Sequence, residues 1–285
     1  MTVRGDFATL QAGRTDPSAP LAVLVPGFTG SKEDFIAILA PIAKAGFAVV
    51  AYDQRSQYET ALRHPGSPPE GWTMAALAAD LLAVAAAVRG AGTGPVHLLG
   101  HSFGGLVARA AVLADPEAFA SLVLLASGPA SIGGHRDELL KTMAGGLEAY
   151  GLAMVWAVTQ SMEAEAGGSR PSDPQIAAFL ELRFMSNDPA GLAAMARLLA
   201  TEPDRTDELA AVAPRTLVAF GAGDDAWSPE IQRETASRLG AGVVSFTEAA
   251  HSPAAEAPEP TATALVTFWM RSEGAGQPPL AEEDL

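Results

Sequence analysis

Residues 98–106 read LLGHSFGGL and place one serine hydroxyl between glycines, directly after an apolar run. Residues 100–104 fit the pattern G-x-S-x-G, in which a nucleophilic serine stands on a sharp turn between a strand and a helix. Such a turn needs small neighbours, because bulk at Gly100 or Gly104 would collide with the adjoining backbone. We therefore interpret Ser102 as a hydroxyl displayed for nucleophilic chemistry.

A serine hydroxyl is a poor nucleophile until a base within hydrogen-bonding distance takes its proton. The chain has five histidines, and His251 follows the last predicted strand directly, in the loop EAAHSPAAEAP. That position would bring it to the same edge of a parallel sheet as Ser102. The other four lie within a predicted strand, in the serine turn itself, or in loops with no acid at a strand end: His97, His101, His64 and His135. His251 is the candidate base.

The acid that orients the base is expected at another strand end, between serine and histidine in chain order. The segment VAFGAGDDAWSP includes the end of a predicted strand, residues 216–220, and the loop after it. Three residues after Gly221, the glycine that follows the strand, is Asp224. Four residues before Pro229, the next proline, is Asp225. We favour Asp224 and keep Asp225 as the alternative. The loop after the preceding predicted strand offers no carboxylate before Asp137, which favours the later loop as the source of the acid.

These residues need a scaffold, and the apolar runs of the chain predict one. Six runs are rich in Val and Leu without period-two alternation, as in parallel strands that are buried on both faces. They are residues 21–25, 48–52, 96–99, 122–126, 216–220 and 243–246. A further pair of strands is expected near residues 3–11.

Helical patterns lie between the predicted strands. Apolar residues recur at helical spacing from Leu77 to Val88, with Thr73 placed to cap the helix and Gly90 to end it. Further helices are predicted at residues 33–44, 105–114, 229–238 and 255–271. The alternation of strand and helix predicts an α/β protein with a doubly wound, mostly parallel sheet.

The alternation stops after Ser127, and residues 128–213 show helical patterns alone. We therefore predict a core of residues 1–127 and 214–272, a helical cap at 128–213, and a flexible acidic tail at 273–285. The cap is rich in methionine and aromatic residues: Met143, Met154, Trp156, Met162, Phe184, Met185 and Met195. Such residues suit a lid over an apolar pocket, although for each one a place in the cap's own core is the favoured interpretation.

The composition predicts a globular protein without nucleic-acid or membrane partners. Hydrophobic residues make up 48% of the 285, which is enough for a packed core. Asp and Glu number 33 against 18 Lys and Arg, and the net charge of -15 repels phosphate backbones and anionic lipid. The longest apolar run, residues 74–88, contains Asp80 and is too short to indicate a membrane span.

The residues required for metal, thiolate or phosphate-binding chemistry are not found in the sequence. The chain has no cysteine, no HExxH and no phosphate-binding G-x-x-x-x-G-K-[ST] segment, so we expect no metal and no cofactor. The start, MTVRGDFATL, contains no apolar stretch of signal-peptide length, and we expect a cytoplasmic protein. The expected partner is a small-molecule substrate, and the residues indicate no oligomeric state.

The segments GHSFGG, GAGDD and AAHSP, with PGFTGS and YDQRSQ earlier, resemble the α/β-hydrolase superfamily over nearly the whole chain. The resemblance implies an eight-stranded sheet, a helical cap inserted after strand six, and a Ser102–His251–Asp224 triad. Residues 26–31, PGFTGS, correspond to the oxyanion loop of that superfamily, with proline in place of the usual histidine. The implied oxyanion donors are the backbone N–H groups of Phe28 and Phe103.

The segment YDQRSQ departs from the superfamily pattern at Ser56, where relatives commonly have glycine. Asp53 and Arg55 in this segment could carry catalytic or substrate-binding charges. We favour a structural interpretation, in which they form buried ion pairs or ion pairs that hold a loop.

The resemblance implies the serine-nucleophile, esterase-like branch, because dehalogenases and epoxide hydrolases of this fold use aspartate at the turn. We therefore expect a carboxylesterase-like acyl hydrolase that cleaves an ester or related acyl bond of a small, largely apolar substrate through an acyl-enzyme. An acyltransferase with the same triad and a non-enzymatic ligand-binding protein on the same fold are the alternatives.

Overall fold

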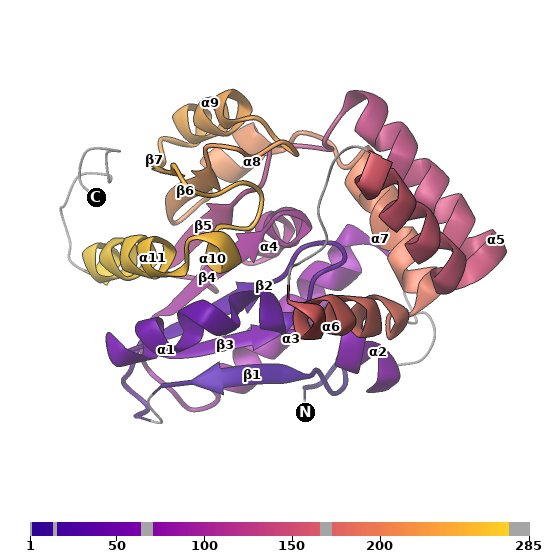
Figure 1. The fold of residues 1–285 in the computed structure, drawn as a ribbon. Helices are drawn as coiled ribbons and strands as arrows, with labels where there is room; N and C mark the ends of the chain where they lie inside the picture. The colour runs from indigo at the N-terminus through magenta and orange to yellow at the C-terminus, as the bar shows by residue number, and fades with distance from the viewer. Residues whose placement is uncertain (1, 14–15, 64–70, 166–172, 274–285) are drawn as a thin grey trace.

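The computed structural model describes residues 2–13, 16–63, 71–165 and 173–273. Within them, a seven-stranded sheet runs through the molecule with helices on both sides (Figure 1). His64 and residues 274–285, which make up nearly all of the predicted tail, lie outside the described residues.

The strands form one sheet in the order β1-β3-β2-β4-β5-β6-β7. In chain order they are β1 Thr9–Ala12, β2 Leu21–Val25, β3 Ala48–Tyr52, β4 Val96–His101, β5 Ser121–Leu125, β6 Arg215–Gly221 and β7 Gly242–Phe246. β1 pairs antiparallel with β3, and the remaining pairs are parallel. The six predicted strands are all present, close to their predicted bounds.

The prediction of eight strands is wrong for the described residues, which contain seven. The difference lies at the N-terminus, where a pair of strands is predicted and β1 alone forms. The preceding residues make an isolated bridge between Thr2 and Gly5, and Arg4 forms an ion pair with buried Asp80. A tight turn that directs Arg4 to this carboxylate therefore takes the place of an additional edge strand.

Most helices agree with the predicted pattern, but the helix at residues 58–63 is not predicted, the one predicted at 33–44 begins as a 3₁₀ helix, and the last is divided in two. In chain order they are the 3₁₀ helix η1 Lys32–Phe35, α1 Ile36–Lys44, α2 Tyr58–Arg63, α3 Met74–Arg89, α4 Phe103–Ala114, α5 Gly134–Glu165, α6 Pro174–Met185, α7 Pro189–Thr201, α8 Thr206–Ala210, α9 Pro229–Leu239, α10 Pro253–Glu256 and α11 Pro258–Glu273. The Thr73 side chain caps α3, and Gly90 ends it at a φ of 52°. The single helix predicted at residues 255–271 is split at Ala257, because Pro258 disfavours helical geometry in the residue before it.

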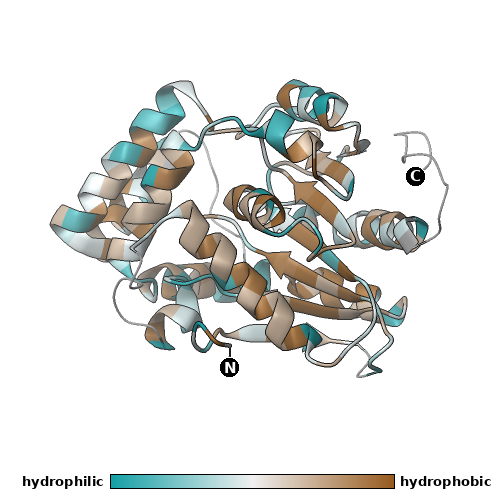
Figure 2. Cartoon of the chain, turned by 180° about the vertical axis from the view of Figure 1, so that it is seen from behind, coloured by the Kyte–Doolittle hydropathy of each residue, from teal (hydrophilic) through white to brown (hydrophobic). Residues whose placement is uncertain are grey.

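Alternate residues of each strand face opposite layers of helices, which explains why the strands have no polar face. Val23 and Val25 of β2 pack into a core that includes residues of α3, α4 and α9, whereas Ala22 and Leu24 pack with α1 and α11. All five residues of β2 are buried. Figure 2 shows the same arrangement as apolar strands inside the molecule, with hydrophilic segments on the outer helices.

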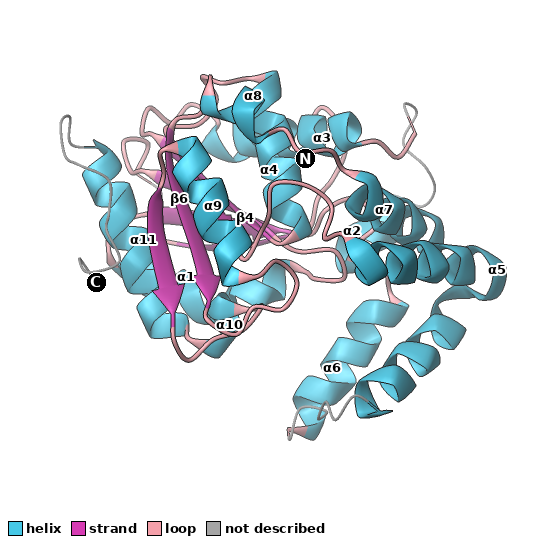
Figure 3. Ribbon diagram, turned by 90° about the horizontal axis from the view of Figure 1, so that it is seen from above, coloured by secondary structure: helices cyan, strands magenta, loops and turns pink. Residues whose placement is uncertain are grey.

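Between β5 and β6 the described chain consists of helices and loops. α5 is interrupted at Gly151, which has a φ of 75°, and it packs along α7. α6 and part of α5 project from the rest of the molecule (Figure 3). α8 packs instead against α4 and α9 of the core layer. The division of the chain into a core and a cap at residues 128–213 stays a prediction.

Buried ion pairs anchor the turn that follows β3. Asp53 contacts Lys32 Nζ at 3.0 Å, and Arg55 Nε contacts Asp80 at 2.7 Å, which agrees with the structural interpretation of both residues. Burial raises the pKa of the Asp53 carboxyl to about 6, even though Lys32 donates to it. Ser56 has a φ of 75°, in the left-handed region that favours glycine.

The first turn of α4 packs directly on the end of β2 because residue 104 has no side chain. A Cβ added at Gly104 would lie 2.4 Å from the carbonyl oxygen of Val25 and 2.5 Å from that of Pro26. A Cβ added at Gly145, inside α5, would meet nothing within 4 Å. The two glycines therefore differ in the space around them, although both are helical.

This difference predicts opposite effects of the same substitution. Gly104→Ala should lower the free energy of unfolding by about 1–3 kcal/mol, because the backbone of β2 must move. Gly145→Ala should raise it by about 0.5–1 kcal/mol, because alanine is the better helix former. Urea unfolding of both variants measures the two changes. A Gly104→Ala protein as stable as the wild type would contradict the close approach of α4 and β2.

Candidate active site

Ser102 stands on a strained turn between β4 and α4. Its φ of 54° and ψ of -123° are rarely adopted by residues with a side chain. Three hydrogen bonds hold this conformation: Ser102 N–H donates to Leu125 O at 2.9 Å, and Ser102 O accepts from Gly105 N–H and from the Ser127 hydroxyl, both at 2.8 Å. A Cβ at Gly100 would lie 2.3 Å from Gly104 O. The small residues of the motif are thus required by the backbone around Ser102.

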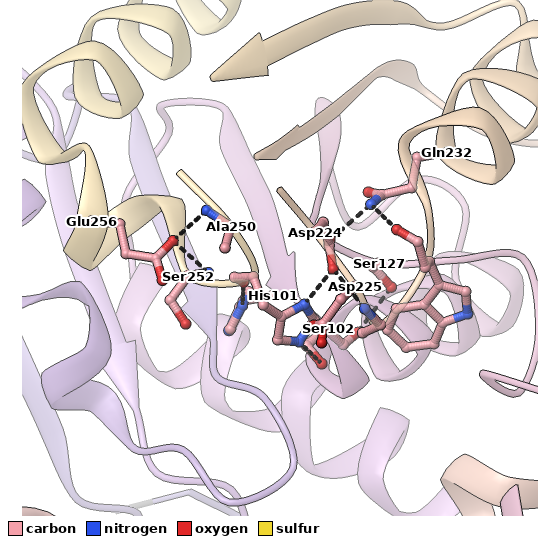
Figure 4. A network of polar contacts seen from close by, with 12 residues as sticks. His101, Ser102, Ser127, Asp224, Asp225, Gln232, Ala250, Ser252 and Glu256 are labelled. Carbon is pink, nitrogen blue, oxygen red and sulfur yellow. Dashed lines mark hydrogen bonds and ion pairs between the residues drawn. The ribbon is translucent and has the colours of Figure 1, made fainter. Parts of the chain in front are cut away.

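Ser102, His251 and Asp224 meet at the carboxyl ends of the parallel strands. Figure 4 labels Ser102 and Asp224 at this edge. Ser102 follows β4, Asp224 lies in the loop after β6, and His251 lies in the loop after β7. His251 Nε2 is 3.0 Å from Ser102 Oγ, and His251 Nδ1 is 2.9 Å from Asp224 Oδ1. Because a carboxylate only accepts, Nδ1 carries the proton, which leaves Nε2 free to accept from the serine hydroxyl.

The two neighbouring aspartates lie in different surroundings. Asp224 is buried and also accepts from Ala226 N–H at 3.0 Å and from Gln232 Nε2 at 2.8 Å. Burial raises the pKa of the Asp224 carboxyl, but the hydrogen bonds and charge of its partners, His251 first, outweigh burial and hold the pKa below its ordinary value. The Asp225 side chain is 76% exposed and bonds to Arg136 at 2.7 Å, so it lies outside the His251 contact.

The loop that carries His251 is held by Glu256, for which the sequence carries no signal, and by His101 of the serine turn. Glu256 Oε2 accepts from the backbone N–H groups of Ala250, at 2.7 Å, and Ser252, at 3.2 Å (Figure 4). His101 Nε2 lies 2.7 Å from the carbonyl oxygen of His251. Burial and the neighbouring His251 lower the pKa of His101, which favours a neutral ring that donates from Nε2.

The segment PGFTGS, residues 26–31, passes beside the serine. A Cβ at Gly27 would lie 3.2 Å from Ser102 Cβ. Among the described residues, none accepts a hydrogen bond from the N–H of Phe28. Phe103 is the first residue of α4, where an N–H has no acceptor within its own helix. The N–H groups of Phe28 and Phe103 thus have no acceptor among the described residues. The resemblance implies that these two groups are the oxyanion donors, and that role stays a prediction.

Phe28 packs against a buried apolar cluster of the helical segment between β5 and β6, which includes Leu147, Val155 and Phe184. Leu140, Met143, Leu152 and Trp156 pack against the same cluster. The methionines predicted for a lid are divided: Met195 is fully buried with the core, whereas Met154, Met162 and Met185 are exposed. Of the predicted lid residues, Met143, Trp156 and Phe184 therefore belong to the cluster beside the candidate site.

In the described part of the chain, the His, Asp and Glu residues form no group of three or more placed to hold a metal ion. None of its helices combines the length and apolar character needed to cross a bilayer.

Comparisons with known proteins give relatives of the same fold. A model of the alpha/beta hydrolase family matches residues 22–264. The chain is 35% identical over 113 residues to "Putative carbamate hydrolase RutD" of Variovorax paradoxus, and 35% identical over 112 residues to the protein of that name from Cronobacter sakazakii. The matched parts make up 40% and 38% of this chain, and they span 39% and 38% of the two relatives.

Solved structures match over most of the chain. An esterase from Thermogutta terrifontis has a TM-score of 0.77 at 23% identity, covering 96% of this chain and 99% of that one. The enol-lactonase of Burkholderia xenovorans LB400 has a TM-score of 0.75 at 22% identity, covering 94% and 98%. At these identities the likeness shows the shared fold. Because the family model covers residues 22–264, which are most of the chain and include all three loops of the site, this chain belongs to the alpha/beta hydrolase family.

Proposed function

We propose that the protein is a serine acyl hydrolase of the carboxylesterase type, which cleaves an ester or related acyl bond of a small, largely apolar substrate. One observation carries the proposal: the unbroken chain of contacts from Ser102 Oγ through the His251 ring to the Asp224 carboxylate. A serine, a base and an orienting acid within hydrogen-bonding distance form the arrangement that activates a hydroxyl for attack on a carbonyl.

In the first step of the proposed mechanism, His251 Nε2 takes the proton of Ser102 as Oγ attacks the carbonyl carbon of the substrate. The carbonyl oxygen becomes an oxyanion, which the N–H groups of Phe28 and Phe103 stabilise. Asp224 holds the imidazole in the required tautomer and stabilises its cationic form. His251 then gives the proton to the leaving group as the bond to the acyl carbon breaks, leaving an acyl-Ser102 ester.

The second step reverses the roles of the same groups. His251 takes a proton from water, and the resulting hydroxide attacks the acyl carbon of the ester at Ser102. The tetrahedral oxyanion again lies on the two backbone donors, and His251 returns the proton to Ser102 Oγ as the acid leaves. Each step therefore requires His251 to stay in contact with Ser102, which the bonds of Glu256 and His101 to its loop support.

The substrate class is inferred from the surroundings of Phe28. The cluster of Leu140, Met143, Leu152 and Trp156 offers apolar and polarisable surface to a substrate whose carbonyl lies beside Ser102. A carbamate is a second candidate because the matched curated relatives are named carbamate hydrolases. Esters and carbamates share a carbonyl carbon bonded to a heteroatom leaving group, so one mechanism serves both.

The Ser102→Ala substitution tests the nucleophile. It should lower kcat for short nitrophenyl esters and the matching nitrophenyl carbamates by about 10⁴-fold or more, because Ser102 supplies the hydroxyl that contacts His251 Nε2 among the described residues. Ser18→Ala, a matched change on an exposed loop, should keep wild-type activity. Wild-type turnover by Ser102→Ala, after purification from host esterases, would rule out the proposed nucleophile.

The two aspartates provide a second test. Asp224→Asn should lower kcat by about 10²- to 10⁴-fold, because an amide in place of the carboxylate disturbs the tautomer of His251 and removes its counter-charge. Asp225→Asn should stay within about twofold of the wild type, since its carboxylate lies in an exposed ion pair. Steady-state rates on one activated ester separate the two. Loss of activity in Asp225→Asn alone would assign the acid to the other residue.

A further inference from the structure

Two glutamines of the turn after β3 are buried beside the candidate oxyanion loop. Gln54 and Gln57 come from the segment YDQRSQ, and their side chains are almost completely shielded from solvent. Gln57 N–H donates to Gln54 O at 2.9 Å, and Gln54 N–H donates to Gln57 Oε1 at 3.0 Å. The second bond fixes the Gln57 amide with its oxygen toward its own turn, so that its NH₂ group points the other way.

That NH₂ group reaches the loop of residues 26–31. Gln57 Nε2 donates to Gly27 O at 2.6 Å and to Phe28 O at 3.1 Å. Gln54 Nε2 donates to Pro26 O at 2.8 Å. Three successive carbonyl groups are thus held by two side chains, in a loop whose first residue is a proline and has no side-chain hydrogen-bonding group.

The bond to Gly27 O bears directly on the Phe28 N–H. The carbonyl of Gly27 and the N–H of Phe28 belong to one peptide unit, which is planar and trans, so the two groups point in opposite directions. Gln57 Nε2 is the shorter of two donors to this oxygen, since Gly30 N–H donates to it at 3.2 Å, and together they fix the direction of the Phe28 N–H. A donor on the oxygen also polarises the unit, because a hydrogen bond to an amide oxygen strengthens the amide as a donor.

We propose that Gln57 is a positioning residue for oxyanion stabilisation: its amide holds the Gly27–Phe28 peptide so that the Phe28 N–H faces the reacting carbonyl at Ser102. The inference rests on the proposed function, since it assigns Gln57 a part in the same reaction. Gln57 contacts neither the substrate nor the triad of Ser102, His251 and Asp224. Its effect passes through the backbone of the loop.

The test compares Gln57→Leu with the wild type in steady-state hydrolysis of a nitrophenyl ester. The substitution keeps an apolar group of similar size and removes the donor. Because a misdirected Phe28 N–H affects the oxyanion more than the bound ester, kcat should fall about 10- to 100-fold while KM stays within roughly threefold. Gln11→Leu, at the far edge of the sheet, should leave both constants unchanged.

A transition-state analogue separates positioning from general structural damage. Ser102 Oγ adds to the carbonyl carbon of an alkyl trifluoromethyl ketone, its proton passes to His251, and the ketone oxygen becomes an oxyanion. Gln57→Leu should weaken the affinity for this ketone by the factor lost in kcat. For the corresponding simple amide, which forms no adduct, the Gln57→Leu variant should have the same affinity as the wild type.

The same measurements on Gln57→Glu and Gln57→Met keep the test decisive if Gln57→Leu fails to fold. Met lacks the donor, and ionised Glu would repel the carbonyls, so both should show the loss in kcat and in ketone affinity. If a folded Gln57 variant keeps wild-type kcat and wild-type ketone affinity, the inference about Gln57 is overturned. If Ser102→Ala is inactive in the same assays, the proposed function still stands. An active Ser102→Ala would instead overturn the function itself. Equal weakening of ketone and amide binding would assign Gln57 a merely structural role.

Discussion

The hydrogen bond between Ser102 Oγ and His251 Nε2 is the contact on which the proposed chemistry of this site depends. It joins residues 149 positions apart in the chain, at a distance of 3.0 Å. Neither residue would be there without the parallel sheet, which ends β4 and β7 at the same edge. Ser102 also keeps a backbone conformation that costs of order 1–3 kcal/mol. The packing of α4 on β2 and the bonds to Leu125 and Ser127 offset that cost.

The site is surrounded by polar contacts that act on backbone as much as on side chains. Gln232 holds the Asp224 carboxylate, Glu256 holds the loop of His251, and Gln57 holds the peptide before Phe28. Each is a side chain from a neighbouring element bonded to a loop that carries a candidate functional group. Such contacts restrict the loops without adding bulk beside Ser102.

Much of the scaffold could be predicted because buried parallel strands have a strong sequence signal. The turn at Ser102 could also be predicted, because its glycines are required by close contacts. A side chain at Gly100 would collide with Gly104, and one at Gly104 would collide with the end of β2. The choice between Asp224 and Asp225 was less certain from sequence, because adjacent residues differ only in the direction of their side chains. Gln57 and Glu256 gave no signal, as their roles depend on contacts to backbone groups. The prediction of an eighth strand was wrong because residues 2–5 form a turn that pairs Arg4 with Asp80. The hydropathy pattern does not show a contact between residues so far apart in the chain.

The central claim is that one hydroxyl of this chain is activated as a nucleophile, and covalent labelling measures this directly. An alkyl fluorophosphonate reacts when an activated serine oxygen attacks phosphorus and fluoride leaves. Mass spectrometry of the digested, labelled protein should find a single adduct on Ser102, and none on a folded His251→Ala variant at the same dose. An adduct at another residue, or an unlabelled wild-type protein, would contradict the account.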